Sequence, residues 1–551
     1  MSDTPKTEAG VESSADDYPS TQKVLRKKGQ YDLIDGFRVW RQYREEVEPE
    51  LADNEMALVL PMLEDDDDVE SILSVFPVER APDFFERSRG LRIGYLQTMD
   101  KFYVPRDFDI DVVLEIVALA REGMRGRHPK NPEVMKVILA AADGKELIVK
   151  RTTRTGGGGG LGIVLIGSSG IGKSSLIERV KELFGYEPHV HLSVNGKPCR
   201  WMQLTAVVVK VQETWKGTLL EILAEIDRQT GRGVMRGFNN NTSTAKLLLA
   251  VKLALCGQFA PILILDEFQC LGRLTKAAAE TIMAGLLEIM EYGGIPVVVV
   301  GTVAVGALFE RHAMEMSKFA GAGRFDMPLM NLDDKDTEVL MQMFKEFAVS
   351  KTPVVYSDDF NYWFMAHTMG VRRFMRITMK AVLKRHAKDE RVIADKSLLE
   401  AIAAKEMASW QLALSLLRKA DLGFEVPLAD QDAYEHFYWT ADRPKPTPAE
   451  EAAHLEWLQE HLDDEGMLTA EEYLIYKARL SADGLRFADK DEAQAKRTRA
   501  AAKKPMTSYE YGKKNQVKRD KKAQNNMDRV VKATTKFDDP TPAPDVAGAL
   551  D

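Results

Sequence analysis

Short apolar runs alternate with longer amphipathic segments through the middle of the chain. Apolar runs bounded by turn signals are typical of buried strands, and apolar positions that recur every three to four residues are typical of helices. In chain order the pattern predicts strands at 163–166, 205–211, 262–266 and 296–300, and helices at 173–184, 218–228, 244–256 and 275–292. Alternating strands and helices favour an α/β fold, with a parallel sheet that carries helices on both faces.

The pattern changes on both sides of this core. Before it lies a mixed region with aromatic clusters and one expected amphipathic helix at 109–121, and after it the chain turns nearly all helical, as a small lid would. Residues 470–480 and a piece near 450–462 also have helical periodicity. The predicted divisions are a disordered terminus 1–30, an N-terminal region and linker 31–130, an α/β core 131–332, a lid 333–410, a helical extension 411–495 and a basic disordered tail 496–551.

Two low-complexity stretches interrupt the first part of the chain. The acidic run Glu64–Asp68 is interpreted as a solvated loop, with docking of a basic partner as the alternative. The glycine run Gly156–Gly160 is interpreted as a flexible connection rather than a second phosphate site.

Composition and charge narrow the class of protein. A chain of 551 residues exceeds one ordinary domain, and 45% hydrophobic residues is normal for a globular protein. Three cysteines without C-x-x-C spacing fit a reducing cytoplasm. No apolar stretch approaches the length of a membrane span, and the polar, acidic N-terminus is unlike a signal peptide. The sequence therefore predicts a cytoplasmic protein that does not contact a membrane.

The segment from Gly167 to Ser174 matches the phosphate-binding motif G-x-x-x-x-G-K-[ST] at every required position, between an expected strand and an expected helix. The backbone N–H groups of such a loop point at the phosphates, and the helix N-terminus adds partial positive charge. Lys173 is expected to contact the β- and γ-phosphates of ATP, and the Ser174 hydroxyl to bind Mg²⁺. The alternative is a plain Gly/Ser turn before a helix. The candidate nucleotide-binding residues here are Gly167, Ser168, Ser169, Gly170, Ile171, Gly172, Lys173, Ser174 and Ser175.

The apolar run at 261–265 ends in two acids, Asp266 and Glu267. The carboxyl ends of parallel strands are where α/β sheets bind ligands. Asp266 is expected to hold Mg²⁺, and Glu267 to polarise the attacking water, because adjacent strand residues point to opposite faces. A strand that happens to end in a polar turn is the alternative. Together the two motifs predict ATP binding and hydrolysis.

Five further side chains are candidates for the same chemistry. Thr302 ends the strand at 296–300 and is expected to sense the γ-phosphate or position water, with a helix cap as the alternative. Arg324 is a candidate arginine finger for a neighbouring subunit, with Lys318 as competitor and a surface arginine as the alternative. Arg372 or Arg373, at the start of a lid helix, is expected to contact the nucleotide phosphates unless both are simply exposed.

The phosphate loop, ILILDEFQCL, IPVVVVGT and the GRF segment together resemble AAA+ ATPases of the TnsC/TniB/MuB group, which are ATP-dependent regulators of DNA transposition. The segment from Gly123 to Pro129 resembles the G-Y-x-x-R-x-P linker of TnsC proteins, with Met124 in place of the aromatic. The resemblance covers roughly residues 95–410. It implies that Arg127 and Pro129 lie near the adenine.

The resemblance also implies partners. TnsC-like ATPases form homo-oligomeric rings or filaments on double-stranded DNA in the ATP state, and they link a target-site selector to the transposase. It implies that a β-hairpin and helix at 207–218 contact the DNA. Lysine side chains and hydroxyl groups, which this segment contains, contact phosphates without reading sequence. Trp215 is expected to pack on the sugar–phosphate edge or to be a surface anchor, and Arg232 and Arg236 mark a possible second DNA-facing loop. The candidate DNA-binding residues are Lys210, Thr214, Trp215, Lys216 and Thr218.

The flanks have their own expected partners. The basic tail 496–551 is expected to dock the transposase, with DNA contact as a secondary effect, and the N-terminal region to meet the target selector. Two other classes of function remain open from the sequence: an AAA+ ATPase of the replication-initiator or clamp-loader type, and a scaffold that binds NTP without hydrolysing it.

Overall fold

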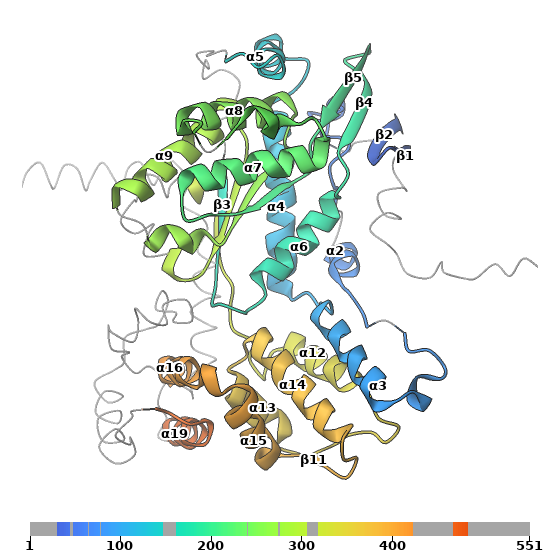
Figure 1. Cartoon of the computed structure of the whole chain (residues 1–551), viewed down its shortest axis with the longest axis vertical. Coiled ribbons are helices and arrows are strands. Elements are labelled where there is room, and N and C mark those ends of the chain that lie inside the picture. Colours follow the sequence, from blue (N-terminus) through green and yellow to red (C-terminus); the bar gives the residue numbers. More distant parts are fainter. Residues whose placement is uncertain are drawn as a thin grey trace, which may run out of the picture. The chain divides into compact units, whose positions relative to one another are not determined.

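The computed structural model describes residues 30–44, 48–63, 66–77, 79–146, 161–239, 241–273, 276–305, 318–422 and 467–482. It divides into two units, Met1–Ile475 and Tyr476–Asp551. The second unit contributes only the end of helix α19 (Ala470–Ala482) to the described residues. All other elements below belong to the first unit (Figure 1).

A five-stranded parallel sheet forms the centre of the first unit, as the alternating pattern predicted. Each strand pairs in parallel with its neighbours; Ile163, for example, lies opposite Val298 on one side and Gly323 on the other. Strands β3, β7 and β8 are buried along their whole length, which explains their nearly continuous apolar sequences. The spatial order is β6 (Val207–Lys210), β7 (Leu263–Asp266), β8 (Val297–Gly301), β3 (Gly162–Ile166) and β9 (Gly323–Asp326).

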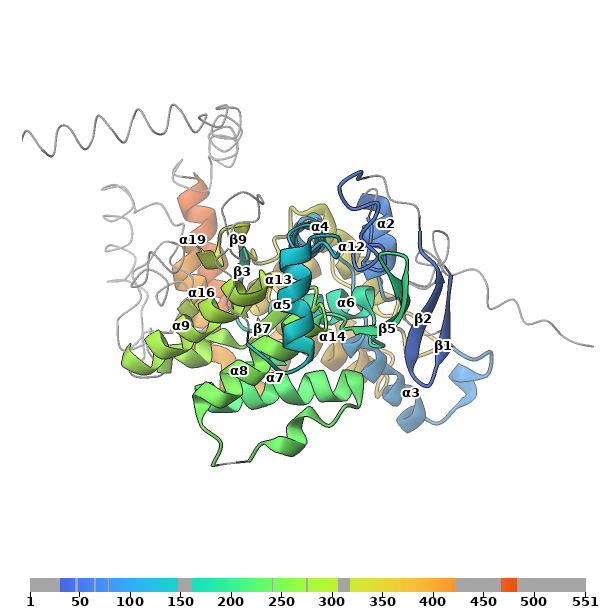
Figure 2. The same ribbon diagram turned by 90° about the horizontal axis from the view of Figure 1, so that it is seen from above.

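Helices cover both faces of this sheet (Figures 1 and 2). Ile163 and Leu165 of β3 pack into a cluster with α4 (Asp107–Arg125) and α6 (Lys173–Phe184). Val164 and Ile166 point to the other face, because successive strand residues alternate. There they meet α7 (Trp215–Thr230), α8 (Thr244–Gly257) and α9 (Lys276–Gly293). Helix α5 (Pro132–Ala142) packs beside α8, where Gly257 leaves room for the backbone of Ala142.

The lid is helical, as expected, and two short parallel strands, β10 (Val355–Tyr356) and β11 (Ile393–Ala394), join it. Its core also contains residues from far upstream. Phe84, Leu96 and Phe102, which the sequence assigned to the N-terminal region, pack in one cluster with lid residues. These residues flank the short helix α3 (Arg89–Tyr95). The lid helices are α12 (Lys335–Lys345), α13 (Phe360–Thr368), α14 (Arg372–His386), α15 (Lys396–Glu406) and α16 (Gln411–Leu422).

A second sheet of four strands was not indicated by the apolar pattern. Its order is β1 (Gln30–Ile34), β2 (Phe37–Gln42), β4 (His189–Val194) and β5 (Lys197–Gln203), and Figures 1 and 2 both draw the two hairpins side by side. The hairpins turn at Asp35-Gly36 and Asn195-Gly196, all with positive φ. Trp40 Nε1 donates to His189 Nδ1 at 3.0 Å, which joins β2 to β4.

The sequence suggested that the acidic run Glu64–Asp68 is a loop, but its described residues are helical. Helix α2 (Asp66–Leu73) begins at Asp66, within the run. Glu64 and Asp65 lie outside the described residues, as do the predicted disordered terminus up to residue 29, the glycine run 156–160, the helical piece near 450–462 and the basic tail 496–551. Among the described helices, none is both long and apolar enough to cross a membrane.

Candidate nucleotide-binding site

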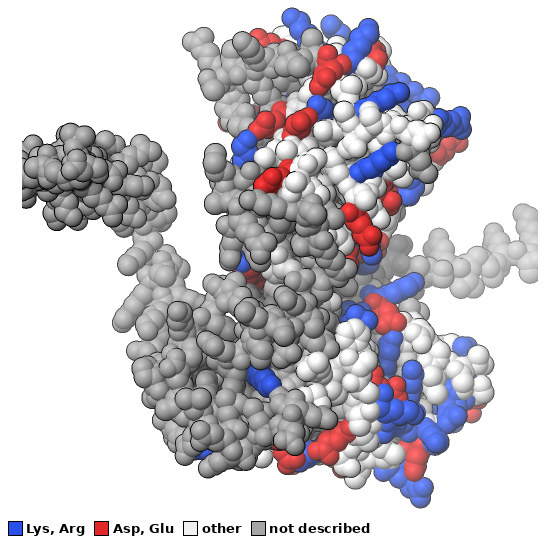
Figure 3. All heavy atoms as spheres, turned by 60° about the vertical axis from the view of Figure 1, so that its left-hand side comes forward, with Lys and Arg blue, Asp and Glu red and all other residues white. Residues whose placement is uncertain are grey.

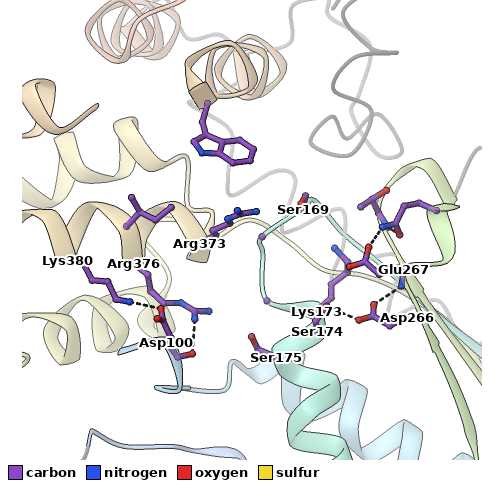
Figure 4. Close-up of a pocket in the computed structure, with 16 residues that line it drawn as sticks. Asp100, Ser169, Lys173, Ser174, Ser175, Asp266, Glu267, Arg373, Arg376 and Lys380 are labelled. Carbon is purple, nitrogen blue, oxygen red and sulfur yellow. Dashed lines mark hydrogen bonds and ion pairs between the residues drawn. The ribbon is translucent and has the colours of Figure 1, made fainter. Parts of the chain in front are cut away.

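The phosphate loop connects β3 to α6 with the geometry that its glycines predict. Gly170 has φ +80° and Gly172 has φ +123°, in the left-handed region that favours glycine. Ser169, Ser174 and Ser175 line a pocket of about 640 Å³, a volume in the range of small-molecule sites (Figure 4). Gly170, Gly172 and Lys173 also line it, whereas Gly167, Ser168 and Ile171 are buried.

Lys173 lies at the base of this pocket and is buried. Its Nζ donates to the carbonyl oxygens of Gly167 at 2.8 Å and Ser168 at 2.9 Å. Burial lowers the pKa of Lys173 to about 8, although Asp266 and Glu267 act in the opposite direction. Phosphate groups in the pocket would supply the negative charge that a buried ammonium group lacks.

Asp266 and Ser174 lie side by side where a metal would meet the phosphates. Ser174 Oγ donates to Asp266 Oδ2 at 2.9 Å, and Asp266 Oδ1 accepts from the backbone N–H of Glu267 at 2.9 Å. A hydroxyl and a carboxylate are hard oxygen ligands, and Mg²⁺ usually takes one or two protein ligands besides phosphate oxygens and water. The residues present therefore fit Mg²⁺.

Glu267 adopts φ +60°, which is unusual for a residue with a side chain. Such a conformation costs on the order of 1–3 kcal/mol and occurs most often at functional sites. The carboxylate of Glu267 accepts a hydrogen bond from Gln269 Nε2. Gln269 Oε1 accepts from the backbone N–H of Thr302 at 3.1 Å. Gln269 thus connects the ends of β7 and β8, and all three residues line the pocket.

The lid supplies the opposite wall of the pocket, and it distinguishes the two candidate arginines. Arg373 lines the pocket, its backbone N–H donates to Gly170 O at 3.0 Å, and its guanidinium carbon lies 4.8 Å from the centroid of the Trp410 ring. Arg372 is buried and donates to Val104 O at 2.9 Å and to Asp109 Oδ2 at 3.2 Å. Arg373 is therefore the one that faces the nucleotide position.

Several pocket residues were missed by sequence reasoning. Lys380 Nζ donates to Asp100 Oδ1 at 2.6 Å, and Arg376 Nη1 donates to the backbone oxygen of Asp100 at 3.0 Å. Figure 4 shows this cluster beside the phosphate loop. Only Gln269, two positions after the acidic pair, had a signal in the local sequence.

The structure does not bring Arg127 and Pro129 to the pocket, which corrects the expectation that they lie near the adenine. Arg127 is buried and donates to Gly123 O at 2.9 Å and Ala260 O at 2.7 Å. Ala260 precedes β7, so Arg127 lies at the end of the sheet opposite the phosphate loop. Pro129 O accepts from Asn195 Nδ2 at 2.8 Å, in the second sheet.

Arg324 and Lys318 also lie away from the pocket. Arg324 is on the edge strand β9 and pairs with Asp326 at 3.0 Å, while Lys318 pairs with Glu291. Neither side chain lines the pocket of its own chain.

The expected DNA-contacting segment is an edge strand followed by a helix, not a β-hairpin. Trp215 is buried against the glycine at position 285, so it is neither a surface anchor nor a platform for the sugar–phosphate edge. Thr218 is buried too, and its hydroxyl donates to Thr214 O. Thr214 caps α7 by accepting from the N–H of residue 217 at 3.0 Å. Of the five candidates, Lys210 and Thr214 are exposed and Lys216 is half-buried.

The possible second DNA-facing loop contains a short 3-10 helix, Val234–Gly237. Arg232 and Arg236 are both exposed there.

Comparison with known proteins agrees with this geometry. Residues 158–305, which include β3, the phosphate loop and the strands up to β8, match the family model described as "AAA domain". The chain contains an AAA+ P-loop core. The matched residues contain every strand of the parallel sheet except β9, and they contain both the phosphate-binding and the acidic motif. No curated protein matches the chain.

Solved structures show more distant likenesses to this AAA+ chain. The Orc1 protein of Aeropyrum pernix in complex with DNA is 15% identical, with a TM-score of 0.33 over 67% of this chain and 83% of that one. Cdc6p from Pyrobaculum aerophilum is 14% identical, with a TM-score of 0.31 over 59% and 90%. RuvB of Thermotoga maritima is 15% identical, with a TM-score of 0.28 over 59% and 95%. TM-scores this low do not decide the function.

Proposed function

We propose that this protein is a Mg²⁺-dependent AAA+ ATPase that assembles on duplex DNA in its ATP state and regulates DNA transposition, as TnsC-like proteins do. The observation that carries the ATPase part is the placement of Lys173, Ser174, Asp266 and Glu267 around one pocket, with Ser174 Oγ 2.9 Å from Asp266 Oδ2. The resemblance of residues 95–410 to the TnsC/TniB/MuB group carries the transposition part.

Each pocket residue has a role in this proposal. Lys173 exchanges its contacts with loop carbonyls for the β- and γ-phosphates. Ser174 and Asp266 hold Mg²⁺, which neutralises phosphate charge when it is bound. Glu267 accepts a hydrogen bond from the attacking water and orients it, and Thr302 and Arg373 sense the γ-phosphate from the sheet and from the lid.

A neighbouring subunit completes the site. Arg324 lies on an edge strand outside the pocket, and its side chain is about one-third exposed. In a homo-oligomer such an arginine reaches the ATP of the next copy and stabilises the transition state, once it leaves Asp326. Hydrolysis is then coupled to assembly, because a single chain lacks this charge.

DNA and protein partners bind other parts of the chain. The exposed Lys210 and Thr214, with Lys216, contact the phosphate backbone without reading sequence. Few contacts per copy suffice, because an oligomer adds them by avidity. The tail 496–551 docks the transposase, and the N-terminal region meets the target selector.

Two variants test the ATPase and its coupling to DNA. Lys173→Ala removes the ammonium group from the pocket and is expected to abolish nucleotide-dependent binding of duplex DNA, measured by fluorescence anisotropy. Glu267→Gln keeps the shape of the side chain but not its charge, so it is expected to bind ATP, to lose turnover by about 10²-fold or more, and to remain on DNA. Lys136→Ala, on the exposed side of α5, is the control.

The outcomes separate the parts of the proposal. Unchanged turnover in Glu267→Gln refutes the role of Glu267, and ATP-dependent DNA binding that persists in Lys173→Ala refutes gating by ATP. Deletion of 496–551 is expected to leave ATP turnover and DNA binding intact and to abolish activation of the transposase in a reconstituted insertion assay. Full activation by the truncated chain would refute docking through the tail.

A further inference from the structure

A basic groove runs along the C-terminal half of α14, next to the nucleotide pocket. Six basic side chains and two acidic ones line it, so it is positive on a chain whose net charge is −9. Figure 3 shows Lys and Arg side chains gathered at the lower right, at the height at which Figure 1 draws α3, α14 and β11. The basic residues are Lys380, Lys384, Arg385, Lys388, Arg391 and Lys405, and the acidic ones are Asp389 and Glu406.

We infer that this lid groove binds the phosphate backbone of duplex DNA, as a contact separate from Lys210, Thr214 and Lys216. The inference rests on the proposed function. It assigns a ligand to a part of the lid that the two sequence motifs do not involve.

Three of the lysines are available for an external anion. Lys384, Lys388 and Lys405 are exposed, and none of them contacts an acidic side chain among the described residues. By contrast, Lys380 pairs with Asp100 at 2.6 Å and Arg391 pairs with Asp389 at 3.0 Å. Unpaired lysines that converge on one groove repel one another, and a bound polyanion relieves that repulsion.

The spacing of the lysines suits a linear array of charges. Lys380, Lys384 and Lys388 follow one another at four-residue intervals from α14 into the turn after it, and the two intervals span about 12 Å at a rise of about 1.5 Å per residue. One strand of duplex DNA advances by three to four phosphates over about 12 Å. Lys405 approaches the groove from α15 and widens the basic surface.

A compact ligand such as free phosphate or a nucleotide fits the groove less well. The groove lies at the C-terminal end of α14, where the backbone presents partial negative charge, so no helix N-terminus is available to cradle a phosphate. Among the residues that the structure describes, no asparagine, glutamine or aromatic side chain lines the groove. Lysines on flexible stems bind backbone phosphates without reading bases.

The groove is continuous with the nucleotide pocket, since Ile377 and Lys380 line both. Arg373, at the first turn of α14, faces the pocket, and Lys384 and Lys388 lie at the other end. One helix therefore contacts both the nucleotide and the DNA. A shift of α14 on binding one ligand would change the affinity for the other.

A double charge reversal, Lys384→Glu with Lys388→Glu, tests the inference in the full-length protein. We expect the Kd for a 30-base-pair duplex, measured by anisotropy with a non-hydrolysable ATP analogue, to rise about tenfold or more at 100 mM salt. The slope of log Kd against log salt should fall by about two, one for each lost phosphate contact. Lys136→Glu with Lys335→Glu makes the same charge change at exposed positions outside the groove and should shift Kd by less than about threefold.

Binding of the ATP analogue is measured in parallel, and Lys384→Ala with Lys388→Ala repeats the test without added negative charge. Unchanged DNA binding in both groove variants, with wild-type binding intact, overturns the inference but not the proposed function. Loss of self-association with DNA affinity retained identifies the groove as an interface between copies and also overturns it. A wild-type protein that binds no duplex in any nucleotide state refutes the proposed function and the inference together. Displacement of the duplex by 1 mM inorganic pyrophosphate would assign the groove to a compact anion instead.

Discussion

Asp109→Asn should weaken the junction between α4 and the lid more than any neighbouring substitution. Asp109 is fully buried and lies between Arg106 Nη2, at 3.0 Å, and Arg372 Nη2, at 3.2 Å. Tyr103 OH donates to the same carboxylate at 2.9 Å, and Arg106 Nη1 reaches the backbone oxygen of residue 328 beyond β9. One negative charge therefore neutralises two buried guanidinium groups from two parts of the fold.

The expected loss follows from this burial. Removing one partner of a buried ion pair typically costs about 3–5 kcal/mol, because the other charge stays buried and uncompensated. The asparagine amide keeps the shape and some hydrogen bonds, but it leaves Arg106 and Arg372 without a counter-ion. Since about 1.4 kcal/mol corresponds to a factor of ten, amide exchange in α4 and α14 should accelerate by two to four orders of magnitude.

The matched control is Asp107→Asn in the first turn of the same helix. Asp107 is exposed, so its removal should cost only the helix-dipole contribution of about 0.3–1 kcal/mol. Hydrogen exchange followed by mass spectrometry measures both variants peptide by peptide. Equal protection of α14 in the two variants would refute the reasoning.

The same pair of variants gives a second readout in acid. Burial alone would raise the pKa of Asp109, but Arg372 and Arg106 outweigh it and hold the pKa below its usual value. A carboxyl with a lowered pKa in the folded state stabilises the fold above its unfolded pKa, and this stability is lost as pH falls through the folded value. Below about pH 4 the free energy of unfolding should therefore depend less on pH in Asp109→Asn than in the wild-type protein, and Asp107→Asn should not show this change.

Three other predictions concern the pocket. Gly170→Ala should raise the Kd for ATP about tenfold or more in a titration with a fluorescent analogue, because φ is +80° and the added Cβ would lie 2.9 Å from Arg373 Cβ. The control is Gly144→Ala, which should leave ATP affinity unchanged, because Gly144 has a similar φ but no atom near the added Cβ. ATP affinity should be constant up to about pH 8 and fall by up to tenfold per pH unit above it, because free Lys173 then loses its proton; a flat calorimetric profile to pH 9.5 would contradict this. Gln269→Ala should lower kcat more than it raises KM in steady-state ATPase assays, since it frees the carboxylate of Glu267, the proposed catalytic group, without touching the phosphate loop. A pure KM effect would contradict that role.

The core was predictable because its signals are local. The predicted helix 173–184 coincides with α6, which begins at the glycine turn of the phosphate loop and ends before Gly185 at φ +90°. The strands of the sheet are buried on both faces, so their apolar runs stand out from the polar turns.

The second sheet was not predictable from apolar runs, because its strands mix polar and aromatic residues. Strand β4 contains His189 and His191, which are buried but hydrogen-bonded to side chains of other strands or segments. The pairing of β2 with β4 joins residues about 150 positions apart, as in Arg38 opposite His189. Only the two turns, Asp-Gly and Asn-Gly, were visible as local hairpin signals.

The pocket likewise contains residues that local motifs predict and residues whose placement depends on contacts between distant parts of the chain. Lys173, Ser174 and Asp266 follow from motifs in which spacing alone fixes the geometry. The choice between Arg372 and Arg373 depends on the helical phase of α14 relative to the core, and the placement of Asp100 beside Lys380 depends on a contact across 280 residues. The placement of Arg127 near adenine was wrong, because its guanidinium binds Ala260 O at the other end of the sheet.

Electron microscopy of the purified full-length protein with short duplex DNA, with and without a non-hydrolysable ATP analogue, tests the central claim most directly. The account predicts rings or spirals that encircle DNA only when the nucleotide is present, with Arg324 of one copy at the pocket of the next. Single chains that leave the DNA bare in both conditions would contradict an ATP-gated assembly on DNA.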